Sequence, residues 1–167
     1  YLTPIYSHAL FYIWNRPYKW VSFDVDDSGI IVFTEVYENQ LTEFYSGISG
    51  CVYECCGNNP DIYKTHINHV FNSEKSVPVI KCHLIDDVYT EILNRERNGE
   101  INIEKYNTLT NEQKQKISMD TIRAIHMQKL LAPSVAVADE MKEEIKFIQD
   151  KFPFEWEFAC RNTQNKI

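Results

Sequence analysis

The chain has 167 residues, 44% of them apolar and 13% aromatic, and a formal net charge of −7. This content of apolar and aromatic residues excludes an intrinsically disordered chain and is sufficient for a buried core. The 17 Lys and Arg residues are scattered and are outnumbered by 24 Asp and Glu residues, which argues against non-specific binding to a nucleic-acid backbone. Because no run of about 18 apolar residues occurs, we expect no membrane span.

The spacing of the five cysteines matches no known disulfide framework. The sequence also lacks the Cys-x-x-Cys pair that is typical of a structural zinc site. The cysteines are Cys51, Cys55, Cys56, Cys82 and Cys160. We therefore expect free thiols, no metal, and a small bacterial-type protein in the reducing cytoplasm. The first residues do not show the pattern of a secretory leader, which is a basic region, an apolar core and a small-residue cleavage site. Because residue 1 lies in strand-like sequence, we expect a partner strand upstream of it.

The segment up to about Ile85 is mainly strand-like. A short helix capped by Thr3, with Pro4 at its first position, is predicted to end near Trp14. Two β-rich runs, 19–25 and 30–37, flank Asp-Asp-Ser-Gly and indicate a hairpin. Two helical turns at 39–45 and a Gly-containing turn at 46–50 follow. Further strands are predicted at 51–55, 67–71 and 77–84, with a turn at 57–61.

From Asp86 onward the apolar period changes to 3.6 residues. Asp86 or Asp87 is predicted to cap a helix that ends at Gly99, and Thr110 with Gln113 to form a capping box before a second helix that ends at Pro133. Ser134 is predicted to cap a third helix. The aromatic tail either packs on the domain or forms a partner surface; it contains Phe152, Phe154, Trp156 and Phe158.

These elements predict a single α+β domain spanning 1–167. Residues 1–85 are predicted to be β-rich, with two small sheets or a split sheet, and residues 86–167 to be mainly helical and to pack against the sheets. Ser46–Gly50 has the glycines of a phosphate-binding loop but lacks the lysine of one and precedes a strand, so we interpret it as a structural turn.

The opening segment resembles a conserved block of the ADP-ribosyltransferase fold, which poly(ADP-ribose) polymerase catalytic domains and RNA 2'-phosphotransferases share. The matching positions are Tyr1, Leu2, Thr3, Ser7, Ala9 and Tyr12. The resemblance implies an NAD-binding cleft lined by Tyr1, Thr3 and Tyr12. Aromatic rings suit that role because they stack on the flat, charged pyridinium of nicotinamide.

The same resemblance implies a late strand pair in which an acidic position precedes Val-Pro. Glu74, ahead of Val77-Pro78, is then the catalytic acid, and a carboxylate there stabilises the oxocarbenium-like ribose that forms as nicotinamide leaves. The bland alternative is a solvated Glu in a turn. The His-x-Thr or His-Gly-Thr strand of these proteins does not occur within residues 1–167.

Two other functions fit the sequence. A non-enzymatic protein-interaction module could keep the same scaffold without the chemistry, with a protein as acceptor or partner. Residues 24–35 place oxygen ligands at Asp24, Asp26, Ser28 and Glu35, with Gly29 at the sixth position, as in a calcium-binding EF-hand loop. The β-rich flanks and Pro17 favour a hairpin turn over that loop.

Overall fold

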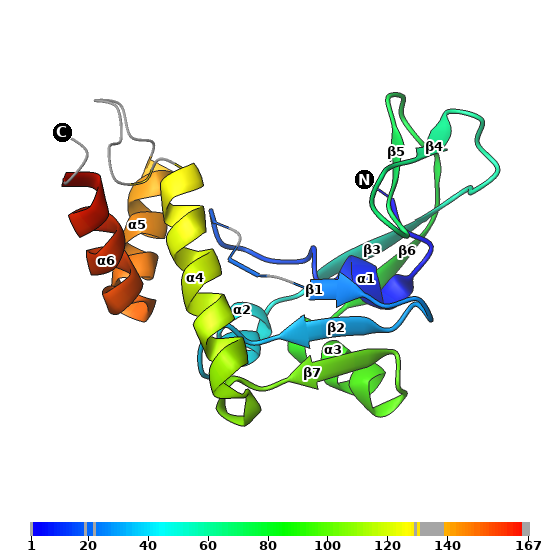
Figure 1. The fold of residues 1–167 in the computed structure, drawn as a ribbon. Coiled ribbons are helices and arrows are strands. Elements are labelled where there is room, and N and C mark those ends of the chain that lie inside the picture. Colours follow the sequence, from blue (N-terminus) through cyan, green and yellow to red (C-terminus); the bar gives the residue numbers. More distant parts are fainter. Residues whose placement is uncertain (1, 19, 22, 129, 131–138, 165–167) are drawn as a thin grey trace. The chain divides into compact units, whose positions relative to one another are not determined.

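The computed structural model describes residues 2–18, 20–21, 23–128, 130 and 139–164. Two compact units are distinguished in it, where the sequence predicts a single domain. The first unit contains residues 1–15, 22–35 and 39–105. The second unit contains residues 16–21, 36–38 and 106–167. Figure 1 traces the order of helices and strands along the chain.

The first unit contains a three-stranded sheet of order β1-β2-β7 (Figure 1). Strands β1 (Phe23–Val25) and β2 (Ile31–Thr34) pair antiparallel across the turn at residues 26–29, which confirms the predicted hairpin. Both strands are shorter than the sequence predicts. Strand β7 (Ile101–Glu104) pairs parallel to β2, in a region that was expected to be helical. The Ile-Asn-Ile-Glu alternation fits a strand, but it spans only four residues between long helical segments.

Two further sheets of two strands each complete the β-structure of the first unit. Strands β3 (Gly50–Cys55) and β6 (Val79–Ile85) pair antiparallel, close to the bounds predicted from the sequence. Strands β4 (Ile62–Lys64) and β5 (Phe71–Ser73) form a separate hairpin. The predicted strand at 67–71 is wrong, because residues 65–70 form the loop of that hairpin, closed by bonds from the Thr65 N–H and hydroxyl to the Val70 carbonyl.

Three helices belong to the first unit. Helix α1 (Tyr6–Leu10) is shorter than predicted, α2 (Gln40–Tyr45) is close to its predicted position, and α3 (Val88–Arg97) begins after Asp87. The Asp87 carboxylate accepts a hydrogen bond from the Thr90 N–H at 2.7 Å, which confirms one of the two predicted caps. Gly99 follows α3 with φ of 76°, a left-handed conformation that favours glycine.

The core of the first unit lies where α1, α2, α3, β2 and β7 contribute alternating or periodic apolar side chains. Phe11 stacks on Phe33 with ring centroids 5.3 Å apart, and the Tyr45 ring meets Phe11 edge-on at 5.7 Å. The buried Tyr45 hydroxyl donates to the Phe11 carbonyl at 3.0 Å, and burial raises the pKa of Tyr45. The fully buried members of this core include Leu10, Phe11, Ile31, Phe33, Tyr45, Val88 and Ile92.

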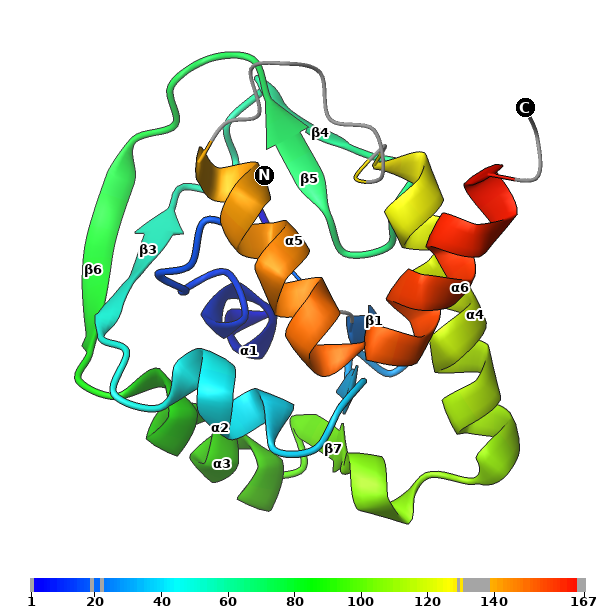
Figure 2. The ribbon, with the colours of Figure 1, turned by 90° about the vertical axis from the view of Figure 1, so that its left-hand side faces the viewer.

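The second unit is mainly helical and includes a short 3-10 turn, η1 (Tyr106–Thr108). Its helices are α4 (Asn111–Met127), α5 (Asp139–Lys151) and α6 (Pro153–Gln164). Helix α6 packs along α4 (Figure 2) and also contacts α5. The predicted capping box of Thr110 and Gln113 is confirmed. The expected helix stop at Pro133 and cap at Ser134 lie outside the described residues. Of the aromatic tail, Phe154, Trp156 and Phe158 lie on α6, a helix that the sequence did not predict.

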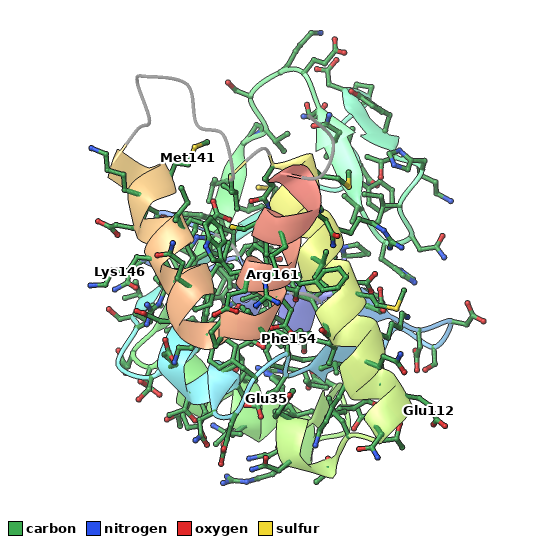
Figure 3. All side chains as sticks on the ribbon, turned by 60° about the vertical axis from the view of Figure 1, so that its left-hand side comes forward. Glu35, Glu112, Met141, Lys146, Phe154 and Arg161 are labelled. Atoms are coloured by element: carbon green, nitrogen blue, oxygen red, sulfur yellow. The ribbon has the colours of Figure 1, made fainter. Side chains whose placement is uncertain are left out.

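Buried aromatic rings form the core of the second unit. Tyr18 stacks on Phe147 of α5 with centroids 4.7 Å apart, and Phe152 contacts both Tyr37 and Trp20 at 5.9 Å. Figure 3 shows Phe154 and Arg161 on α6, and the Phe154 side chain is 67% exposed. Of the aromatic tail, Phe152 therefore packs inward while Phe154 faces outward. The strands form small separate sheets, mostly in the N-terminal part of the chain, and the long helices lie mostly in the C-terminal part. The chain therefore has an α+β fold, as predicted.

Candidate functional site

Thr3 lies beside the start of α1, but it does not cap that helix. The residue at the cap position is Ile5, which has no side-chain oxygen, and the Ile5 carbonyl accepts bonds from the N–H groups of His8 and Ala9. The Thr3 hydroxyl instead accepts a bond from the Ile5 N–H at 3.2 Å and lies 3.1 Å from His8 Nδ1. The predicted cap is wrong because the turn formed by Thr3 closes before the first helical residue.

Tyr12 follows the end of α1 and forms an aromatic cluster with residues on both sides of it in the chain. Its ring centroid lies 5.5 Å from that of His8, 5.8 Å from Phe23 on β1 and 6.0 Å from Trp14. The Tyr12 side chain remains 44% exposed, so one part of the ring packs on the cluster while another meets solvent. An aromatic ring held in this way is available for stacking on a planar ligand.

His8 connects two of the predicted site residues. It is 3% exposed, contacts the Thr3 hydroxyl through Nδ1 and packs edge-on against Phe23 at 5.2 Å. Thr3 and Tyr12 therefore share a neighbour, although they are nine positions apart in the sequence. His8 was not predicted from the sequence, where the available signal was its i, i+4 spacing to Tyr12, which places both on one face of a helix.

Glu74 lies in the turn after β5, and its side chain is exposed. In the described part of the chain no hydrogen bond or ion pair joins Glu74 to Thr3 or Tyr12. The adjacent Lys75 ammonium forms an ion pair with Asp61 at 2.9 Å, which ties the turn to the start of β4. Tyr1 lies outside the described residues, so its predicted role remains a prediction.

A two-way backbone pairing connects the opening segment to β5. The Leu2 N–H donates to the Phe71 carbonyl at 2.9 Å, and the Phe71 N–H donates to the Leu2 carbonyl at 2.8 Å. Thr3 follows one partner of this pair and Glu74 comes three residues after the other. At about 3.3 Å of rise per extended residue, Glu74 is on the order of 10 Å along the chain from the pair.

A polar network behind α1 was also not predicted from the sequence. The Ser7 hydroxyl donates to Glu100, and the Arg95 guanidinium bonds Glu100 at 3.0 Å and Glu91 at 2.8 Å. The Ser7 hydrogen bond and the Arg95 charge hold the pKa of Glu100 below its ordinary value. Burial, with the charge of Glu91, raises the pKa of Tyr6, whose ring lies 4.5 Å below the Arg95 guanidinium. This network fixes α1 against α3 and β7.

Residues 24–35 form a hairpin, one of the two structures that the sequence left open. The Asp26 carboxylate closes the turn by accepting bonds from the Ser28 and Ile30 N–H groups, both at 2.9 Å. The Ser28 hydroxyl also donates to this carboxylate, and its bond, followed by those backbone bonds, lowers the pKa of Asp26. Glu35 lies beyond the far end of β2 and is buried, where it accepts a bond from the Leu41 N–H at 3.1 Å. Asp26 and Glu35 thus serve separate parts of the fold.

The two glycines of the turn at residues 46–50, which we interpret as a structural turn, contact other parts of the fold. Gly47 has φ of 70°, and its N–H donates to the Asp87 carboxylate at 2.8 Å, so that amide serves the cap of α3. A Cβ on Gly50 would lie 2.5 Å from Ile13 Cγ2, which means that Gly50 permits close packing of Ile13. Within the described residues no group of three or more His, Cys, Asp or Glu side chains is placed to hold a metal ion.

Comparisons of the chain with protein-family models, with curated proteins and with solved structures find no match. Among the described residues no helix has the length and apolar character needed to cross a bilayer. Function is therefore inferred from the site geometry and from the resemblance of the opening segment.

Proposed function

We propose that this chain is an ADP-ribosyltransferase-like protein that binds NAD beside α1 and β5. The observation that carries the proposal is the Leu2–Phe71 pairing, with its bonds of 2.9 and 2.8 Å. It supports the proposal because it connects the segment of Thr3 and Tyr12 with the strand that leads to Glu74. Those are the two parts of the chain in which the resemblance implies site residues.

Tyr12 is the proposed contact for nicotinamide. Its partly exposed ring packs on His8 and Phe23. Because these contacts already restrict the ring, stacking on a pyridinium would cost little additional side-chain entropy. Thr3 already contacts the Ile5 N–H and His8, so its proposed role is to position His8 and, through it, the Tyr12 ring.

Glu74 is the proposed catalytic carboxylate. In the transfer reaction the bond between the ribose C1' and the nicotinamide nitrogen breaks, and nicotinamide leaves with the electron pair. Positive charge develops on the ribose, and a carboxylate bonded to a ribose hydroxyl stabilises it. A protein side chain then attacks C1' and loses its proton. The exposed position of Glu74 leaves both of its oxygens accessible to a ligand.

The test is calorimetric titration with NAD, combined with measurement of nicotinamide release. Glu74→Gln should retain saturable NAD binding but lose nicotinamide release, since the amide keeps the shape and removes the charge. Tyr12→Ala should lose the binding itself. Glu112→Gln, an exposed carboxylate on α4 (Figure 3), is the matched control and should behave like the parent. Absence of saturable binding in the folded parent would rule out the proposal.

A second candidate is a protein-interaction module, and a specific observation favours it. On the β3–β6 pair the side chains of Tyr53, Ile80 and Leu84 are 61%, 65% and 77% exposed. Exposed apolar groups gathered on one strand pair are typical of interaction surfaces. A second copy of the chain is the partner we propose here. Its test is light scattering over a concentration series, in which the parent should associate and Leu84→Glu should remain a monomer.

A further inference from the structure

Two cysteines face each other diagonally on the β3–β6 strand pair. The register places Cys51 opposite Leu84 and Tyr53 opposite Cys82. Because side chains alternate between the faces of a strand, Cys51, Tyr53, Cys82 and Leu84 share one face. Cys51 and Cys82 are then diagonal neighbours on that face, and they come from strands about thirty residues apart in the chain.

Both thiols can be reached from solvent. Cys82 is exposed and Cys51 is half-buried. The Cys51 thiol raises the pKa of the Cys82 thiol, which agrees with the closeness that the strand register gives the two residues. The same Cys51 thiol acts on Tyr53 and raises the pKa of its phenol.

The strand pair has the freedom to bring these two residues together. Diagonal neighbours in a flat sheet have Cα atoms about 7–8 Å apart, slightly beyond the usual range for a disulfide. A ribbon of only two strands twists more than a wide sheet, and a bulge strengthens the twist further. Here the sheet has two strands, and the register shifts between Glu54 and Cys55.

We propose that Cys51 and Cys82 form a reversible disulfide when the chain meets a disulfide oxidant such as oxidised glutathione. The Cys82 thiolate attacks one sulfur of the oxidant, forms a mixed disulfide and releases one glutathione. The Cys51 thiolate then attacks the Cys82 sulfur, forms the internal disulfide and releases the second glutathione. The two protein thiols lose two protons and two electrons, and the oxidant becomes two reduced glutathione molecules.

The disulfide would close a loop that contains β4, β5 and Glu74. Closing a loop of this length restricts the unfolded chain, so the oxidised protein should melt about 5 °C higher than the reduced protein. Because the bond would join exposed residues across a diagonal, mild reductants should reverse it. The proposal does not depend on NAD binding, and it can be tested without any activity.

The experiment is oxidation of the full chain by a graded glutathione buffer, followed by thiol counting and peptide mapping. The number of free thiols should fall from five to three. Cleavage after Lys81 and Glu54 separates Cys82 from Cys51 and separates Cys51 from the cysteines that follow it. A linked pair of peptides containing Cys51 and Cys82 is expected, and it should disappear on reduction.

Single variants distinguish this pair from other links. Cys51→Ser should abolish the link and leave glutathione attached to Cys82, while Cys56→Ser and Cys160→Ser, the matched controls, should link like the parent. Cys82→Ser provides an independent loss of the same link should Cys51→Ser misfold. A link that persists in a folded Cys51→Ser or Cys82→Ser variant, or a parent with no linked peptide at any glutathione ratio, would overturn the proposal.

Discussion

Two sheets of the first unit contain similar apolar residues, which are buried in one sheet and exposed in the other. In the β1-β2-β7 sheet, Ile31, Phe33 and Ile101 are at most 3% exposed, and Phe33 stacks on Phe11. In the β3–β6 pair, Tyr53, Ile80 and Leu84 are more than half exposed. The first sheet therefore contributes apolar burial to stability, and the second leaves apolar side chains and two thiols accessible to other molecules. A strand-like apolar pattern alone does not distinguish these two situations.

The largest effect that would test this contrast is expected from Phe33→Ala. Phe33 is fully buried and stacks on Phe11, so the substitution removes apolar burial and leaves a cavity. We expect unfolding free energy to fall by about 3–5 kcal/mol, measured by urea denaturation. A loss below about 1 kcal/mol would mean that the core of the first unit lies elsewhere.

An intermediate effect is expected from Glu100→Gln, and it depends on pH. The folded pKa of Glu100 is below its ordinary value of 4.5, so its charged form stabilises the fold above that pH, and this contribution is lost as pH falls through the folded pKa. The parent should lose stability on acidification below about pH 4.5 more steeply than Glu100→Gln.

Thermal melts of both proteins between neutral and acidic pH provide the measurement. Glu112→Gln, an exposed carboxylate on α4, is the control and should keep the slope of the parent. Parallel acid slopes for parent and Glu100→Gln would show that the bonds from Ser7 and Arg95 contribute no pH-dependent stability.

The smallest effect is expected from Leu84→Ala. Because the Leu84 side chain is 77% exposed, little apolar surface returns to water, and the unfolding free energy should change by less than about 0.5 kcal/mol. Urea denaturation at low protein concentration, where self-association is absent, is the measurement. A loss comparable to that of Phe33→Ala would show that the face of the β3–β6 pair is covered in solution.

Sequence reasoning succeeded where local chemistry decides the structure. Asp87 with Gly99, and Thr110 with Gln113, mark helix ends through short-range bonds, and the structure confirms both. The turn of the first hairpin is likewise closed by Asp26 within five residues. Such signals need no knowledge of the rest of the chain.

Sequence reasoning failed where distant residues decide. Strand β7 alternates apolar and polar residues over only four positions, and its pairing depends on β2, about seventy residues earlier in the chain. Ile67 and Val70 look strand-like, yet they belong to a loop in which His69 has φ of 59°. The spaced aromatic residues of the tail suggested no helix, although Pro153 suits its first turn and Phe154 and Phe158 lie four residues apart on one face.

For the candidate site, the resemblance predicts roles for Thr3 and Tyr12 but none for His8, which contacts both. The network of Ser7, Arg95 and Glu100 could not be predicted, because nearly a hundred residues separate Ser7 from its partner. Glu74 was proposed from the sequence next to Val-Pro alone. The Leu2–Phe71 pairing brings the strand before Glu74 next to the opening segment, and no local sequence pattern predicts that pairing.

The parallel pairing of β2 with β7 has a consequence for the order of folding. Ile31 and Ile101 are direct partners, although seventy positions separate them in the chain. During synthesis the first hairpin leaves the ribosome long before β7. The backbone groups on one edge of β2 therefore have no strand partner until residue 104 has also emerged. Fragments that end before Ile101 should therefore aggregate during expression, and the shortest piece that folds should extend through β7.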